Sequence, residues 1–121
     1  MGLDLATTVL IVDDHPGFRS SARMLLEAEG FEVVGEAADG RTAISAARDL
    51  EPDVVLLDVQ LPDLDGFEVS SRLTANGARP AVVLTSSRDG CDYGSLAGSS
   101  GARGFIPKSE LSGVALEALL P

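Results

Sequence analysis

Residues 8–16 of the chain read TVLIVDDHP, a short β-prone run followed at once by two carboxylates, a histidine and a proline. A continuous apolar run bounded by polar residues is typical of a strand that is buried on both faces of a parallel sheet. Pro16 suits the first turn of a helix, because an N–H at that position would have no helical partner. The stretch therefore predicts a strand, a polar turn and a helix, in that order.

Similar units recur along the chain. The predicted strands are 8–12, 31–37, 53–57, 81–84 and 104–107. The run 31–37 alternates less cleanly than the others, which indicates a strand near the sheet edge. Helices are predicted from Pro16 to Gly30, from Gly40 to Leu50, from Gly66 to Asn76 and from near Ser109 onward. The predicted buried face of the last helix consists of Leu111, Val114, Ala115, Ala118 and Leu119.

Strands that alternate with helices predict right-handed parallel βαβ units and an open α/β sheet with helices on both faces. At 121 residues, the chain has the length of one domain, residues 1–121. In such sheets ligands bind beyond the carboxyl ends of the strands. We therefore expect functional residues at those ends.

The net charge of the chain limits the classes of partner that it can bind. Nineteen acidic and nine basic residues give a net charge of −10, which disfavours direct binding to nucleic acid. A single cysteine, Cys91, has no partner for an internal disulfide, and no apolar run is long enough to suggest a membrane span. The sequence therefore predicts a cytoplasmic, globular protein without a membrane partner.

Five polar residues follow the predicted strands: Asp13, Asp14, Asp58, Thr85 and Lys108. Two like charges about 4 Å apart repel by about 4 kcal/mol at an effective dielectric constant of about 20, so the carboxylates need cations beside them. Lys108 supplies one charge. A Mg²⁺ ion, which takes one or two carboxylates and keeps several waters, would supply two more.

The same residues suit phosphoryl transfer. This chemistry needs a positioned nucleophile, a metal ion that neutralises the transferring oxygens, and a cationic donor. Asp58 is the candidate nucleophile. Lys108 and the Thr85 hydroxyl would meet the oxygens of the bound phosphoryl group.

These motifs closely resemble the response-regulator receiver domain of two-component systems over nearly the whole chain. The resemblance rests on residues 9–16 (VLIVDDHP), 54–58 (VVLLD), 61–66 (LPDLDG), Thr85-Ser86 and 101–108 (GARGFIPK). Any one motif alone is weakly specific, but together they occur in the order and spacing of the family. The resemblance implies a flavodoxin-like sheet with strand order 2-1-3-4-5.

The resemblance also implies a role for each site residue. Asp58 accepts a phosphoryl group from a sensor histidine kinase. Asp13 and Asp58 ligate Mg²⁺, with Asp14 acting largely through water and the backbone carbonyl of Gln60 completing the site. Lys108 and Thr85 contact phosphoryl oxygens, Phe105 changes rotamer, and Gln60 and Ser87 tune hydrolysis.

The implied output is conformational. The signal would reach a face formed by the segment 88–101, the strand 104–107 and the last helix, which is also a possible homodimer surface. The opening DDHP and the stretch 104–111 look most like the branch that precedes a helix-turn-helix DNA-binding domain, which is absent here. The resemblance thus implies a phosphoacceptor that assists its own phosphotransfer and slow dephosphorylation, and not a dedicated enzyme.

Each residue also has a structural explanation. Asp13 and Asp14 suit a helix cap, Asp58 a turn, Lys108 the surface and Thr85 a strand end. None of these explains why all five residues converge on one end of a sheet. His15 is the only histidine, and we interpret it as a residue that shapes the helix entrance.

Three other functions fit parts of this pattern. A phosphatase or phosphotransferase with an aspartyl-phosphate intermediate usually has a second acid two residues after the nucleophile, where this chain has Gln60. A nucleotide- or flavin-binding domain would need a Gly-rich or hydroxyl-rich phosphate loop after the first strand, where this chain has Asp13, Asp14 and His15. A phosphorylation-independent interaction module of the same fold is the main alternative, but it leaves the acidic cluster unexplained.

Two features depart from the family pattern. Many members have proline directly after the lysine, whereas here Pro107 precedes Lys108 and Ser109 follows it. The segment 88–101 is rich in Gly and Ser, so backbone entropy opposes a helix there. We expect this helix to be weak.

Overall fold

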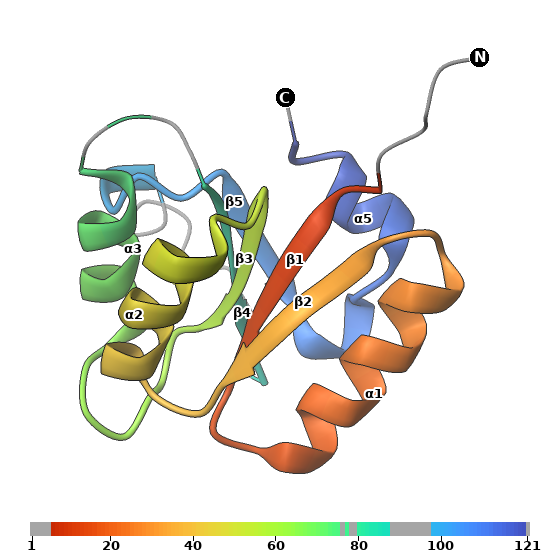
Figure 1. Ribbon diagram of the computed structural model, residues 1–121, viewed down its shortest axis with the longest axis horizontal. Coiled ribbons are helices and arrows are strands. Elements are labelled where there is room, and N and C mark those ends of the chain that lie inside the picture. Colours follow the sequence, from red (N-terminus) through yellow and green to blue (C-terminus); the bar gives the residue numbers. More distant parts are fainter. Residues whose placement is uncertain (1–5, 76, 78–79, 88–97, 121) are drawn as a thin grey trace.

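The computed structural model describes residues 6–75, 77, 80–87 and 98–120. Five parallel strands form one sheet in the order β2-β1-β3-β4-β5 (Figure 1). The strands are β1 (Thr8–Val12), β2 (Glu32–Ala37), β3 (Val54–Asp58), β4 (Ala81–Ser86) and β5 (Gly104–Pro107). This confirms the predicted sheet and its strand order, and it places β2 at an edge, as its weaker alternation indicated.

Helices cover both faces of the sheet. They are α1 (Pro16–Ala28), α2 (Gly40–Leu50), α3 (Gly66–Thr74) and α5 (Gly113–Glu117), with a 3₁₀ turn, η2 (Lys108–Glu110). Figure 1 shows α2 and α3 on one side of the sheet and α1 and α5 on the other. Two aliphatic clusters fill these layers, one joining the strands to Ala43, Ala47 and Val69, the other joining them to Ala22, Leu26 and Leu116.

Side-chain caps fix the starts of three helices. Asp39 Oδ1 accepts a hydrogen bond from Thr42 N at 2.8 Å, and Asp65 Oδ1 accepts one from Glu68 N at 2.8 Å. At α5, Ser112 Oγ accepts from Ala115 N at 3.0 Å. These bonds satisfy amide donors that have no partner inside the first turn.

The predicted last helix was wrong in its start and only partly right in its buried face, since Leu111, Ala115 and Leu119 pack against the core but two other predicted residues do not. The chain makes the 3₁₀ turn first, and α5 begins only after the Ser112 cap. Leu116 is fully buried, whereas Val114 is 76% exposed. Ala118 is also exposed, although the periodicity placed it with Val114 in the core.

Two strand ends also differ from the prediction. Asp58 is the last residue of β3, and Thr85 lies within β4 instead of after it. The prediction of a weak helix in 88–101 falls largely outside the described residues, although Gly98 and Ser99 are helical. None of the described helices is long and apolar enough to cross a membrane.

Candidate phosphoacceptor site

The polar residues predicted at the strand ends lie at the carboxyl edge of the sheet. Asp13 follows β1 and is fully buried, while Asp58 ends β3 and is 4% exposed. Asp58 pairs with Thr85 across the β3–β4 ladder, so both side chains leave the sheet on the same face. Parallel strands therefore bring together residues that are far apart in the sequence.

Lys108 joins the two buried carboxylates. Its Nζ lies 2.6 Å from Asp13 Oδ2 and 3.3 Å from Asp58 Oδ2. The ammonium group also lies 4.6 Å from the centre of the Phe18 ring, a cation–π contact with α1. Burial lowers the pKa of Lys108, but the hydrogen bonds and charges of Asp13 and Asp58 outweigh burial and raise it above its ordinary value. The two carboxylates therefore favour the charged form of Lys108.

The environment of Asp58 opposes its ionisation. Burial raises the pKa of Asp58, and the negative charge of Asp13 raises it further. The Gln60 N–H, which donates to Asp58 Oδ1 at 3.1 Å, and Lys108 act in the other direction, but the net pKa remains above its ordinary value. A positive charge added beside Asp58 would therefore stabilise its ionised form.

Thr85 carries a buried hydroxyl without a partner. It is 1% exposed, and within the described part of the chain nothing hydrogen-bonds its Oγ1. A buried polar atom without a hydrogen-bond partner lowers the stability of the fold by about 1–3 kcal/mol. Such an atom needs an explanation, and a hydrogen bond to a bound ligand is one. Ser87 lies just after β4 and is exposed, whereas Phe105 lies in β5 and packs partly buried on the α2/α3 side of the sheet.

His15 lies at the entrance of α1 as predicted, but its contacts and those of Arg19 with the site were not predicted from the sequence. His15 donates its backbone N–H to Asp13 Oδ1 at 2.8 Å, and its Nδ1 lies 3.0 Å from that oxygen and 3.1 Å from Asp14 Oδ1. Arg19 Nη1 donates to the Asp13 carbonyl at 2.7 Å, while Arg19 Nε pairs with Glu36 at 3.0 Å. The sequence shows that Arg19 lies one helical turn after His15. It does not show that Arg19 contacts β2.

A third such residue is Asp63, in the loop between β3 and α3. Its carboxylate accepts hydrogen bonds from Gly40 N at 2.7 Å and Arg41 N at 3.0 Å, both at the start of α2. It also accepts one from Leu64 N at 2.8 Å. The Gly40 hydrogen bond is the main cause that lowers the pKa of Asp63. Asp63 thus ties the loop that contains Gln60 to α2.

The predicted acidic cluster is close enough for one metal ion. Asp13, Asp14, His15 and Asp58 each offer a ligand atom, and these atoms lie within 4.8 Å of one another. Three carboxylates face one ammonium group, and oxygen donors are the ligands that Mg²⁺ prefers. The cluster includes Asp13 Oδ2, a buried oxygen that accepts no hydrogen bond among the described residues, so the carboxylates fit a hard divalent cation.

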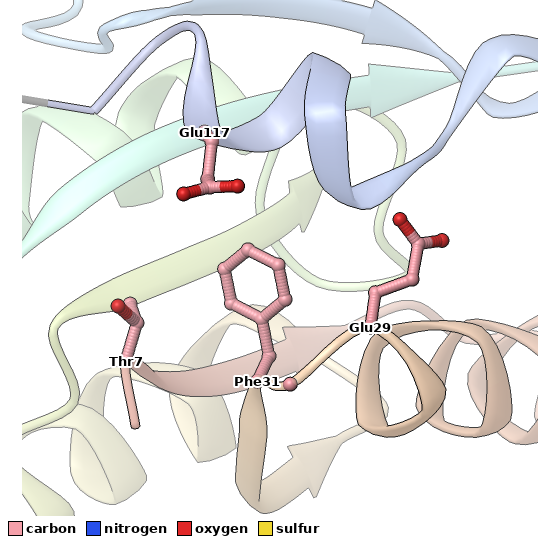
Figure 2. A pocket seen from close by; sticks show the side chains of 5 residues that line it. Thr7, Glu29, Phe31 and Glu117 are labelled. Atoms are coloured by element: carbon pink, nitrogen blue, oxygen red, sulfur yellow. The ribbon is translucent and has the colours of Figure 1, made fainter. Parts of the chain in front are cut away.

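A separate pocket lies at the opposite, amino-terminal ends of β1 and β2. Figure 2 shows the Phe31 ring between Thr7, Glu29 and Glu117. Glu29 Oε1 accepts a hydrogen bond from Gly113 N at 2.9 Å, which joins the end of α1 to the start of α5. None of the predicted site residues lines this pocket.

The sheet order and the acidic cluster at its carboxyl edge define an α/β domain of the flavodoxin-like type. Residues 9–119 match the response regulator receiver domain, and the chain belongs to that family. BvgA of Bordetella pertussis, a positive transcription regulator of virulence factors, is 41% identical over 102 residues. The match covers 84% of this chain and 49% of BvgA, so the chain spans about half the length of that relative.

Solved structures agree with this assignment. The receiver domain of the response regulator NarL from Mycobacterium tuberculosis is 33% identical, with a TM-score of 0.81 over 94% of this chain and 96% of that chain. CheY of Borrelia burgdorferi, in a complex with CheX, BeF₃ and Mg²⁺, is 26% identical. Its TM-score is 0.80 over 93% of this chain and 84% of that chain.

Proposed function

We propose that Asp58 is the phosphoacceptor of this receiver domain. The observation that carries the proposal is the surroundings of Asp58. The carboxylate is buried at the end of β3, Lys108 Nζ lies 3.3 Å away, and the paired residue Thr85 has a buried hydroxyl without a described partner. A phosphoryl group on Asp58 would bring acceptor oxygens to both donors.

The proposed step is a phosphoryl transfer from the phosphohistidine of a sensor kinase. A carboxylate oxygen of Asp58 attacks phosphorus, a P–O bond forms, and the P–N bond of the donor breaks. The leaving imidazole nitrogen takes up a proton. Lys108 neutralises part of the charge on the transferring oxygens, and the Thr85 hydroxyl donates to one of them.

Mg²⁺ would supply charge neutralisation at the attacking and transferring oxygens when bound. Asp13 and Asp58 are its proposed direct ligands, with Asp14 acting largely through water and the Gln60 carbonyl completing the site. Asp13 Oδ2 is buried and accepts no hydrogen bond among the described residues, although Lys108 Nζ forms an ion pair with it at 2.6 Å. The carboxylate of Asp14 is 39% exposed and contacts only His15 among the ion pairs described. The Mg²⁺ bound to the similar CheY supports this choice of metal.

The wider role follows from the relatives and is part of the proposal. The chain would act as a phosphorylation-controlled signalling domain of a longer transcription regulator, because its match to the transcription regulator BvgA covers only 49% of BvgA. Residues 1–121 would form the whole receiver domain. Phosphorylation would act on β5, α5 and the segment before them, with the Phe105 rotamer and Ser87 and Gln60 as modulators, and this face would mediate any homodimer.

Intact-mass spectrometry tests the proposal. A small phosphoramidate donor with Mg²⁺ should add one phosphoryl group that is stable in acid and labile in base. Asp58→Asn should abolish the addition, whereas Asp65→Asn, which removes an exposed carboxylate in the next loop, should retain it. If wild type gains no mass, or Asp58→Asn gains as much, the interaction-module alternative replaces phosphotransfer.

A further inference from the structure

The His15 side chain lies in the middle of the acidic cluster. Its Nδ1 lies 3.0 Å from Asp13 Oδ1 and 3.1 Å from Asp14 Oδ1. Neighbouring ligands of a six-coordinate ion with bonds of about 2.1 Å are about 3.0 Å apart, and opposite ligands are about 4.2 Å apart. His15 Nδ1 is hydrogen-bonded to Asp13 Oδ1 without an ion, and the same spacing would suit neighbouring ligands once a metal ion replaces the shared proton.

The backbone holds the imidazole in this place. His15 N donates to Asp13 Oδ1 at 2.8 Å, so the residue is anchored to the same carboxylate that its ring approaches. Asp14 is its immediate neighbour in the β1–α1 turn, and Pro16 begins α1 directly after it. The side chain is 68% exposed, so solvent and ions can reach the ring.

We propose that His15 Nδ1 is a metal ligand of this site and that it makes the site favour imidazole-accepting transition-metal ions, such as Ni²⁺, more than oxygen ligands alone would. The proposal rests on the proposed function, because it concerns the same cation site. Imidazole nitrogen adds little for Mg²⁺, which prefers oxygen, but it adds affinity for first-row transition metals. His15 thus determines metal selectivity, while the carboxylates determine that a divalent ion binds at all.

A matched pair of variants separates ligation from positioning. In His15→Asn, the side-chain amide keeps a hydrogen-bond donor near the place of Nδ1 but offers no imidazole nitrogen. In His15→Ala, both are lost. Both variants are made with Cys91→Ser in tag-free protein, so that the only thiol and any added histidines do not bind metal.

Calorimetric titrations of these proteins with Ni²⁺ and with Mg²⁺ give the selectivity. We expect His15→Asn to weaken Ni²⁺ binding about tenfold or more and to change Mg²⁺ binding by less than about threefold. Asp58→Asn should weaken both ions. Loss of Ni²⁺ affinity in His15→Ala but not in His15→Asn would show that His15 only positions the carboxylates, and would overturn the proposal.

Bound Mn²⁺ gives a spectroscopic readout. Because His15 is the only histidine, any imidazole ¹⁴N modulation in pulsed electron paramagnetic resonance of the Mn²⁺ complex must come from it. Wild type should show the modulation and His15→Asn should not. Absence of modulation in wild type, or of Ni²⁺ binding, would overturn the inference. If phosphorylation of Asp58 with Mg²⁺ persists in that case, the proposed function stands.

Discussion

Lys108 Nζ lies 2.6 Å from Asp13 Oδ2. This ion pair joins the residue that follows β5 to the residue that follows β1. β3 and β4 separate these two strands in the sheet, so the ion pair spans the carboxyl edge above them. The same ammonium group contacts Asp58 on β3. Lys108 therefore contacts both buried carboxylates and offsets one of their two negative charges before any metal ion or phosphoryl group binds.

Lys108→Met should destabilise the fold. Methionine keeps an unbranched stem near Phe18 but leaves Asp13 and Asp58 buried without a cation. We expect a loss of about 3 kcal/mol in the free energy of unfolding at neutral pH in EDTA, measured by urea denaturation. Saturating Mg²⁺ should recover part of this loss, because the ion replaces the missing positive charge.

Arg103→Met is the control for this substitution. Arg103 is exposed beside the same strand, and the described ion pairs do not include it. Its replacement should change the stability by no more than about 0.5 kcal/mol. Equal stability of the two variants would contradict the charge-balancing role of Lys108.

Asp58→Asn should stabilise the metal-free protein at neutral pH. Burial and the Asp13 charge raise the pKa of Asp58 above 3.8, so the folded state holds this proton more tightly than the unfolded state. As the pH rises past 3.8, the ordinary pKa of an aspartate, Asp58 loses its proton first in the unfolded state. The wild type therefore becomes less stable than the neutral Asn variant. Once the folded carboxyl has also ionised, the difference stays constant up to neutral pH.

The measurement is a series of urea titrations from about pH 3 to pH 8 in EDTA. The stability of Asp58→Asn relative to wild type should rise with pH and then level off. Mg²⁺ should reverse the order, since tenfold more Mg²⁺ than its Kd stabilises wild type by about 1.4 kcal/mol and the variant by less. A variant less stable than wild type at neutral pH in EDTA would show that burial does not dominate the pKa of Asp58.

Asp63→Ala should lower both the stability and the Mg²⁺ affinity. The substitution removes the acceptor for Gly40 N and Arg41 N, and it frees the loop that presents the Gln60 carbonyl. We expect Mg²⁺ binding to weaken up to about tenfold in calorimetric titrations. Since its hydrogen bonds lower the pKa of Asp63, the stability that it contributes is present above pH 3.8 and is lost as the pH falls through the lower folded value.

Asp39→Ala is the matched control for Asp63→Ala. Asp39 caps the same helix, through Thr42 N, but it lies before α2 and not in the Gln60 loop. It should reduce the melting temperature without a comparable change in Mg²⁺ affinity. If both variants bind Mg²⁺ equally well, the loop does not depend on Asp63.

Local sequence patterns were sufficient for the sheet but not for the last helix. The strand 8–12 is an isolated apolar run, so only one assignment fits it. In contrast, 111–120 has apolar residues on all sides, and the periodicity of Leu111, Val114 and Ala118 was as good as that of Gly113, Leu116 and Leu120. The Ser112 cap decides between the two phases, because it fixes where the first turn begins.

The site likewise contains some residues that local sequence patterns predict and others that they do not. Asp13, Asp58 and Lys108 each follow or end a strand, and parallel strands bring their carboxyl ends together whatever the loops do. Asp63 and Arg19 act through bonds to α2 and β2 that depend on how separate segments pack. No local pattern encodes such contacts, so these residues required the structure.

Gly66→Ala should disturb Asp58 through the backbone. Gly66 begins α3, and a Cβ there would overlap the Asp58 carbonyl oxygen and lie 2.7 Å from Val59 Cα. These are main-chain atoms at the end of β3, which cannot turn aside as a side chain would. We expect a loss of about 2 kcal/mol in unfolding free energy and a slower gain of phosphoryl mass at a fixed donor concentration.

Gly17→Ala provides the comparison, because Gly17 lies in the first turn of α1 and a Cβ there has no atom within 4 Å among the described residues. Alanine is the better helix former, so this variant should be unchanged or more stable by up to about 1 kcal/mol. Its phosphorylation rate should match wild type. If Gly66→Ala behaved like Gly17→Ala in both measurements, α3 would not be packed against the strand that carries Asp58. The close approach of Gly66 to β3 would then have no part in positioning the acceptor.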